Sequence, residues 1–314
     1  MKGTKLSVVL ITGLLVVGGT TITTKNVSAQ EGVGVSISPL TFELTANPEE
    51  TLVNKLRVYN PTDSIISVKM IVEDFAVEGE TGGVKTEPAG TETYSLARWI
   101  RADPSEFTLE PREQKFVDFY IEVPKNAEPG GHYGSILPSI TGVISQEETG
   151  IATSLRVGSL VLLTISGEVT ESLKVAEFSA PSFSEYGPIN FILRFRNEGT
   201  VHVRPKGFVT IADWRGKKVA DIEFSQLNVI PGAIRKITAI WGKKWLIGRF
   251  TATLVGSYGT SNTPIEPYVI TFWSFPWKIG LGICLAAVIL LAFFAKTRKR
   301  WLMALKILIK GEKP

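Results

Sequence analysis

Side chains that could support catalysis are few and scattered. The chain has two histidines, His132 and His202, and its one cysteine, Cys284, lies in a long apolar run. These cannot supply the ligands of a His/Cys zinc site. Ser135 follows His132 by three residues, but no nucleophile-elbow sequence surrounds it. We therefore predict no metal, no cofactor and no enzymatic activity.

Carboxylate pairs offer weak alternatives. Glu73 and Asp74 are adjacent, and Asp103 and Glu106 flank a Pro-Ser turn. Glycosidases use two such carboxylates, but solvated turn residues and turn-capping aspartates are commoner. The glycine-rich stretches have no phosphate-loop lysine and precede strands, so the sequence does not predict nucleotide binding.

Tryptophans beside cations are the better candidates for a binding surface. The candidate residues are Trp99, Arg101, Trp241, Lys243, Lys244 and Trp245. Strand alternation leaves Trp99 either buried in a sandwich core or exposed as a platform on which sugars stack. Lys243 and Lys244 require solvent, so the turn around them is either an aromatic-basic surface near a bilayer or has its tryptophans in the core.

A segment near the C-terminus predicts a membrane-spanning helix. Residues 279–295 carry no charge, and a helix of this length is near the minimum that crosses a hydrocarbon core. A buried helix of a soluble protein is the alternative. Residues 301–310 could continue as an amphipathic helix on anionic lipid.

The flanks of this segment predict its orientation. Trp273 and Trp277 precede it, as expected of aromatic residues at the headgroup level. Lys296, Arg298, Lys299 and Arg300 follow it, and short basic flanks stay on the cytoplasmic side. We therefore predict a single-pass protein of the cell membrane, with residues 273–295 as the span, residues 296–314 as a cytoplasmic tail and the rest outside.

The N-terminus agrees with export. Lys2 and Lys5 precede an apolar run, and small residues end at Ala29, so we expect a signal peptide over residues 1–29 with cleavage between Ala29 and Gln30. Retention of the segment as a second anchor is the alternative.

Charge is distributed unevenly along the chain. Residues 30–277 carry 23 basic and 29 acidic side chains, so the basic excess belongs to the targeting and membrane segments and does not predict nucleic-acid binding. Residues 30–170 have 10 basic and 21 acidic side chains, whereas residues 171–277 have 13 and 8. A basic half near the membrane suits anionic lipid or wall polymer, although ordinary solvated surface is the simpler interpretation.

Short alternating apolar runs, separated by Pro, Gly and Asn, predict an all-β fold. Ile189, Phe191, Leu193 and Phe195 share one face of a strand, for example. Residues 76–96 have the composition of a mobile loop. We predict two tandem Ig-like or Fn3-like β-sandwich domains, residues 30–170 and 171–272, followed by the single transmembrane helix.

Landmarks recur in the same order in the two halves. One strand ends at Asn60 and another at Asn197. Leu109-Glu110-Pro111 matches Ile230-Pro231, and Gly130-Gly131-His132-Tyr133 matches Ile247-Gly248-Arg249-Phe250. The sequence therefore predicts one sandwich topology used twice.

The first half resembles a known family. Its marks are Ser38-Pro39, Asn60-Pro61-Thr62, Leu109-Glu110-Pro111 and the turn at 129–134, followed by Arg156-Val157-Gly158. Residues 33–170 resemble DUF916, the peptidoglycan-binding domain of WxL-interacting surface proteins of Gram-positive bacteria, and the second half resembles Fn3 or CARDB-type modules. The resemblance implies a non-enzymatic surface protein that binds cell-wall polymer or other surface proteins.

A second function is open at this stage. Paired Ig-like domains also resemble fimbrial chaperones, which cap the exposed strands of exported subunits by β-augmentation. This interpretation predicts a basic cleft between the domains for a carboxylate of the client, with Arg156, Arg194 or Arg196 as the cation.

Overall fold

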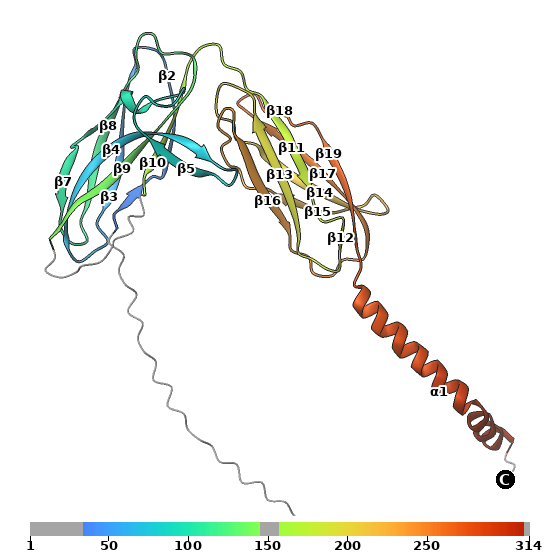
Figure 1. Cartoon of the computed structure of the whole chain (residues 1–314). Helices are drawn as coiled ribbons and strands as arrows, with labels where there is room; N and C mark the ends of the chain where they lie inside the picture. Colours follow the sequence, from blue (N-terminus) through green and yellow to red (C-terminus); the bar gives the residue numbers. More distant parts are fainter. Residues whose placement is uncertain (1–33, 145–156, 311–314) are drawn as a thin grey trace, which may run out of the picture.

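The computed structural model describes residues 34–144 and 157–310. It contains two β-rich bodies and one long helix that leaves the second body (Figure 1). The expected signal peptide with Ala29 and Gln30, and also Arg156, lie outside the described residues. The all-β architecture with one C-terminal helix agrees with the sequence prediction.

The first sandwich packs two sheets face to face. One sheet has the order β1-β3-β8-β6 and the other β2-β10-β9-β4-β5, with β7 paired to β4. Its elements are β1 (Ser36–Ser38), β2 (Thr41–Ala46), β3 (Thr51–Tyr59), β4 (Ile65–Glu78), β5 (Gly83–Glu87), η1 (Ala97–Trp99), β6 (Ile100–Asp103), β7 (Glu106–Leu109), β8 (Gln114–Glu122), β9 (Gly130–Ile144) and β10 (Ser159–Ile165). Alternate residues of both sheets fill a largely aliphatic core.

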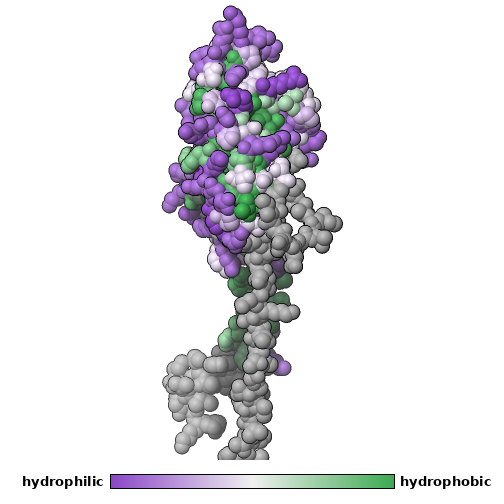
Figure 2. All heavy atoms as spheres, turned by 90° about the vertical axis from the view of Figure 1, so that its left-hand side faces the viewer, coloured by the Kyte–Doolittle hydropathy of each residue, from purple (hydrophilic) through white to green (hydrophobic). Residues whose placement is uncertain are grey.

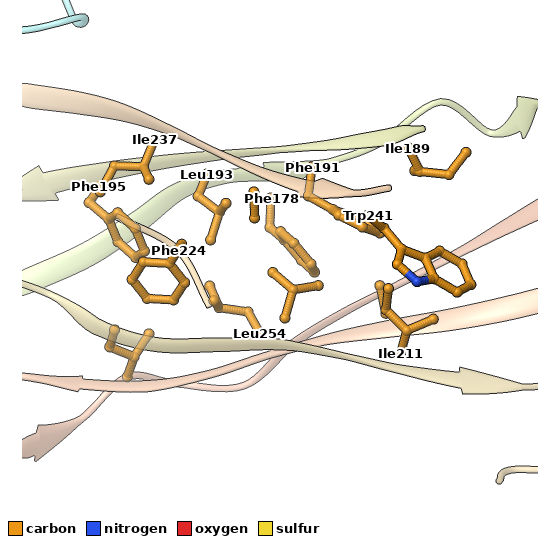
Figure 3. Packing of buried hydrophobic residues seen from close by; sticks show 14 of the residues in the cluster. Phe178, Ile189, Phe191, Leu193, Phe195, Ile211, Phe224, Ile237, Trp241 and Leu254 are labelled. Carbon is orange, nitrogen blue, oxygen red and sulfur yellow. The ribbon is translucent and has the colours of Figure 1, made fainter. Parts of the chain in front are cut away.

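The second sandwich has the sheets β11-β13-β16 and β12-β19-β17-β14-β15, with β18 paired to β17. Its strands are β11 (Leu173–Ser179), β12 (Phe183–Ser184), β13 (Ile189–Asn197), β14 (Lys206–Asp213), β15 (Lys218–Glu223), β16 (Ile234–Trp241), β17 (Gly248–Tyr258), β18 (Thr263–Pro264) and β19 (Tyr268–Ser274). Its core combines aromatic rings with aliphatic side chains (Figure 3). The Phe195 and Phe224 rings lie 5.7 Å apart, and Trp241 meets Phe250 edge-on at 5.3 Å.

The strand order is the same in both sandwiches. β1, β3 and β8 take the places of β11, β13 and β16, and β2, β10, β9, β4 and β5 take those of β12, β19, β17, β14 and β15. Even the parallel pairing of β2 with β10 recurs between β12 and β19. The topology is therefore duplicated, as the recurring landmarks predict. The boundaries at residues 170 and 272 stay predictions.

A buried asparagine ends the second strand of the four-stranded sheet in the first sandwich. Asn60 is fully buried, and its Nδ2 donates to the carbonyls of Ser64 at 2.8 Å and Glu110 at 2.9 Å. Its Oδ1 accepts from the backbone N–H of Thr62 at 3.0 Å. The side chain thus satisfies backbone groups in two loops that would otherwise be buried without partners.

Asn197 makes the same contacts in the second sandwich. Its Nδ2 donates to the carbonyls of Val201 at 2.8 Å and Val229 at 2.7 Å, and its Oδ1 accepts from the N–H of Gly199 at 2.8 Å. The sequence match between Asn60 and Asn197 therefore marks one structural device used twice.

Residues 76–96 differ in part from the sequence expectation. Residues 76–87 form the end of β4, a tight turn and β5, whereas residues 88–96 are a loop as expected. The buried carboxylate of Asp74 accepts hydrogen bonds from the backbone N–H groups of Gly90, Leu96 and Ala97 at 2.6, 3.1 and 2.9 Å. The Gly and Glu residues of this segment belong to the hairpin turn. The hydrogen bonds of Asp74 hold the backbone that follows the hairpin in place.

The helix α1 (Trp277–Lys310) leaves the second sandwich after only two residues beyond β19. Its first 22 residues, Trp277–Arg298, are long and apolar enough to cross a membrane. The visible part of α1 is hydrophobic, whereas hydrophobic residues on the β body are interspersed with hydrophilic ones (Figure 2). Trp273 belongs to β19 rather than to the helix, and Lys296, Arg298, Lys299 and Arg300 all lie in α1, so helix continues into the expected tail.

Replacing Asn60 with alanine should strip three hydrogen bonds from buried backbone groups. We expect Asn60→Ala to lower the free energy of unfolding by about 2–4 kcal/mol, because each buried unsatisfied group costs about 1–3 kcal/mol. Urea denaturation measures the change. The exposed Asn190 is the control, and Asn190→Ala should change stability by less than about 0.5 kcal/mol. Equal effects of the two substitutions would contradict the structural role of Asn60.

Candidate functional site

The structure separates Trp99 from Arg101. Residues 97–99 form the 3-10 helix η1, so Trp99 does not follow strand alternation. Its ring is half-buried and lies 4.5 Å from the ring of His132. The guanidinium of Arg101 is on the outer sheet face, 4.7 Å above the ring of Tyr120. The two residues therefore do not form one surface, and Trp99 is not a free stacking platform.

Trp241 is a core residue, which corrects its assignment to a binding surface. It is the last residue of β16 and is only 4 % exposed, packed against Phe250 and Phe272. Lys243, Lys244 and Trp245 follow it in an exposed loop, and the ammonium of Lys244 lies 5.7 Å from the ring of Trp245. The predicted aromatic-basic turn therefore exists without Trp241.

His132 and Ser135 bind backbone groups instead of each other. The ring nitrogens of His132 are 3.3 Å and 3.0 Å from the carbonyls of Ser95 and Glu128. The hydroxyl of Ser135 donates to the carbonyl of Glu73 at 3.0 Å. Within residues 34–144 and 157–310, no cluster of three His, Cys, Asp or Glu side chains could hold a metal ion.

The feature that sequence reasoning missed is the junction between the sandwiches. The turn of the β4–β5 hairpin reaches the second sandwich (Figure 1). There the carboxylate of Glu80 accepts from Nε of Arg194 at 2.7 Å and also from its Nη2, and the backbone carbonyl of Glu80 accepts from the N–H of Lys236 at 2.7 Å. We call this contact the hairpin latch.

Electrostatics and chain geometry both favour the latch. Hydrogen bonds from Arg194 lower the pKa of Glu80, and Arg194 also donates to Glu177 at 3.1 Å. Gly82 has a φ of +90°, and the guanidinium of Arg235 occupies the space that a Cβ at this position would need. A left-handed glycine thus brings the hairpin backbone against Arg235.

A second polar contact lies at β2. The carboxylate of Glu43 accepts from Arg204 and from Nδ2 of Asn228, the latter at 2.7 Å. Between the two polar contacts, Phe75, Tyr133 and Leu162 of the first sandwich form a small apolar cluster with Ile230 of the second. The junction therefore combines an apolar centre with charged pairs on its sides, as protein interfaces commonly do.

An open cleft of about 270 Å³ lies at this junction. Apolar side chains from both sandwiches line it, together with the guanidinium groups of Arg204 and Arg235. Arg204 is paired with Glu43, whereas Nε of Arg235 is buried and has no hydrogen-bond partner in the structure. Burial lowers the pKa of Arg235, because desolvation disfavours the charged guanidinium.

These positions correct two of the three expected cations, Arg194 and Arg196. Arg194 is occupied by Glu80 and Glu177, Arg196 is exposed on β13, and Arg156 lies outside the described residues. Arg235 and Arg204 line the cleft instead. The only signal for them in the sequence is the arginine-rich character of the second half, which does not single out positions.

Comparison with known proteins gives only distant structural likeness. No family model and no curated protein matches the chain. A chain from the structure titled as a chaperone–tip adhesin complex of CFA/I fimbriae biogenesis matches with a TM-score of 0.38 and 11% identity, over 76% of this chain and 98% of that chain. The class 5 fimbriae chaperone CfaA matches with a TM-score of 0.36 and 11% identity, over 76% and 99%. The Salmonella enterica SafA pilin–SafB chaperone complex matches with a TM-score of 0.37 and 11% identity, over 77% and 98%. Likeness at this level assigns no function.

Removal of the Glu80 carboxylate should loosen the latch. Arg194 keeps Glu177 as a partner and the ion pair is open to solvent, so we expect Glu80→Ala to weaken the junction only modestly. The Lys236 amide should then exchange its hydrogen about fivefold faster. Glu78 is exposed in the same hairpin, so Glu78→Ala is the control. An unchanged exchange rate in Glu80→Ala would show that the ion pair does not hold the hairpin.

His202 lies at the junction, where its ring meets that of Tyr133 edge-on at 5.9 Å, and acid should weaken the junction through it. Burial lowers the pKa of His202 below its usual 6.5, with Glu43 and Arg204 as the nearby charges. The folded protein disfavours the imidazolium. The stability is therefore fully present above the pKa of the unfolded state and is lost as the pH falls from there through the lower pKa of the folded state. Urea unfolding at pH 7.5 and 5.5 should show a lower midpoint at pH 5.5, and His202→Gln should reduce the difference. Glu80 and Glu177 have pKa values below 4.5 and do not titrate in this window.

Proposed function

We propose that the chain is a membrane-anchored, non-enzymatic binding protein of the bacterial cell surface, built from two Ig-like sandwiches that hold segments of other exported proteins in the cleft between them. In this proposal α1 spans the membrane, the sandwiches lie outside and the C-terminus is cytoplasmic. The single observation that carries it is Arg235, whose Nε is buried without a partner in a cleft with apolar walls.

The chemistry of the cleft defines the class of ligand. A buried guanidinium nitrogen without an acceptor is costly, and a carboxylate would supply the missing acceptor and a counter-charge. Phe75, Leu160, Leu162 and Ile230 offer apolar contacts next to it. These features suit a polypeptide segment that presents a carboxylate beside an apolar side chain.

The strand arrangement supports an extended conformation for that segment. β2 contributes Thr41 and Glu43 to the lining of the cleft. Among the described strands only β10 pairs with β2, so the other edge of β2 is open to further strand pairing. An extended segment could add to such an edge, which would cap the client strand as a chaperone does.

A second candidate function is binding of cell-wall polymer, which the resemblance to DUF916 implies. The observation that favours it is the outer face of the β1-β3-β8-β6 sheet. Phe116 is 60 % exposed there, Val53 is 56 % exposed, and Arg101 stacks on Tyr120. Exposed rings beside hydrogen-bonding side chains suit sugars, although ordinary surface has single exposed apolar residues too.

The two functions are separated by a binding experiment on the full chain in lipid nanodiscs. The first probe is a fluorescent peptide of alternating valine and threonine with a free C-terminal carboxylate, compared with its C-terminal amide. We expect the free acid to bind about tenfold more tightly, because a hydrogen bond to a charged group contributes about 1.5–3 kcal/mol. Arg235→Met should abolish the preference, and Arg196→Met, at an exposed arginine of the same sandwich, should retain it.

The second probe is purified cell-wall sacculi. If the wild-type protein binds the free-acid peptide and the amide peptide with equal affinity, the proposed function of the cleft is overturned. This outcome does not depend on any variant. Saturable binding to sacculi that survives Arg235→Met and is lost in Phe116→Ser would establish the wall-binding alternative. Urea denaturation of each variant shows whether a loss of binding reflects unfolding.

A further inference from the structure

Exposed aromatic residues gather at the end of the second sandwich from which α1 leaves. Trp214, Trp245, Trp273 and Trp277 are 66 %, 55 %, 56 % and 48 % exposed. They come from the β14–β15 turn, the loop after β16, the end of β19 and the start of α1. We call this end the base. So many exposed tryptophans in one place are unusual for a surface that meets only water.

One side of the base is fastened to the start of α1. The ammonium of Lys278 lies 2.8 Å from the carboxylate of Glu185, and the N–H of Phe275 donates to the carbonyl of Ser184 at 3.1 Å. In the same loop, the N–H of Gly187 donates to the carbonyl of Lys244 at 2.9 Å. The loop that carries Trp245 is therefore held beside the point where the helix begins.

The other side of the base is formed by the β14–β15 turn. The Trp214 ring lies against Gly248, with 3.5 Å between its edge and the position of a Cβ there. Trp214, Arg249 and Trp273 line one open groove of about 800 Å³. Because Gly248 pairs with Ser274 at the end of β19, this turn also lies at the end of the sandwich where the helix emerges.

Each of three exposed tryptophans has a cation over its ring. Arg215 lies 4.5 Å from the ring of Trp214, Lys244 lies 5.7 Å from that of Trp245, and Lys278 lies 5.8 Å from that of Trp277. Tryptophan is favoured at the headgroup level of a bilayer, and lysine and arginine are attracted to anionic lipid. The half of the chain that contains the base is also its basic half, with 13 basic and 8 acidic side chains over residues 171–277.

We propose that the base docks on anionic lipid headgroups around the entry point of α1, with Trp214 and Trp245 at the bilayer interface and their cations on lipid phosphates. This inference rests on the proposed membrane anchoring. The docking goes beyond the anchoring, because a spanning helix alone does not require the sandwich to touch lipid. Docking at two loops on either side of the helix sets the tilt of the sandwich against the bilayer.

Fluorescence quenching by brominated lipids tests the docking on the full chain in nanodiscs. All variants carry Trp301→Phe so that the tail contributes no emission. Trp99 and Trp241 remain in every variant and give a common background emission. Against it, Trp214→Phe/Trp245→Phe leaves the tryptophans at the helix entry, and Trp273→Phe/Trp277→Phe leaves those of the two loops. We expect bromines near the headgroup end of the acyl chain to quench both sets. Quenching of the loop set should weaken in zwitterionic lipid or high salt, because the cations then lose their partners.

The outcomes distinguish the docking from the anchoring. Quenching of the helix-entry set without the loop set would overturn the docking and leave the membrane span intact. Quenching of neither set would overturn both.

Charge reversal gives an independent check in anionic nanodiscs. Lys243→Glu/Lys244→Glu should lower the quenching of the loop set about twofold or more, because two attractive charges become repulsive. The control is Lys206→Glu, at an exposed lysine at the opposite end of β14. Equal quenching in the base and control variants would contradict a role for lipid charge in the docking.

Discussion

The contact between the β4–β5 hairpin and the second sandwich sets the arrangement on which the rest of the molecule depends. An ion pair that is about one-third exposed, as Glu80–Arg194 is, contributes little by itself. Here it is combined with the backbone hydrogen bond to Lys236, the close approach of Gly82 to Arg235, and the apolar cluster around Phe75. Because these groups act at one place, two bodies that could otherwise move independently share a defined cleft. The position of the cleft above the base follows from the same contact.

One strand topology appears twice in this chain, but the cores of the two copies are built from different side chains. The core of the first sandwich relies on Val, Ile and Leu. The second buries six phenylalanines together with Trp241, namely Phe178, Phe191, Phe195, Phe224, Phe250 and Phe272. The shared elements are the backbone devices, above all the buried asparagines at positions 60 and 197. An asparagine that bonds loop backbone constrains chain geometry tightly, whereas a core accepts many combinations of apolar side chains of suitable total volume. This explains why the landmarks of the repeat are turns rather than core residues.

The sequence predicted the features that depend on local pattern. Alternation identified strands such as Ile189–Asn197, Asn60 and Asn197 indicated the repeat, and the uncharged run at 279–295 indicated the helix. It failed where contacts join distant residues. Glu80 and Arg194 are 114 positions apart, and nothing near either one indicates the other. The sequence also failed to tell which tryptophans are buried. Trp241 ends a strand and lies in the core, whereas Trp245 lies in the exposed loop that follows. Residues 76–87 were misjudged because the glycines that suggest a loop also permit the tight turn of a hairpin.

The direct connection of β19 to α1 has a mechanical consequence. Only Phe275 and Pro276 separate the strand from the helix, and β19 is paired with β17 from Tyr268 to Ser274. A pull along α1 would therefore load the hydrogen bonds between these strands in shear, so that several must break together rather than one after another. If α1 spans a bilayer as proposed, the sandwich would resist extraction by tension much better than a domain whose terminal strand peels from its end. Force on a bound partner would then reach the bilayer without first extending a slack tether.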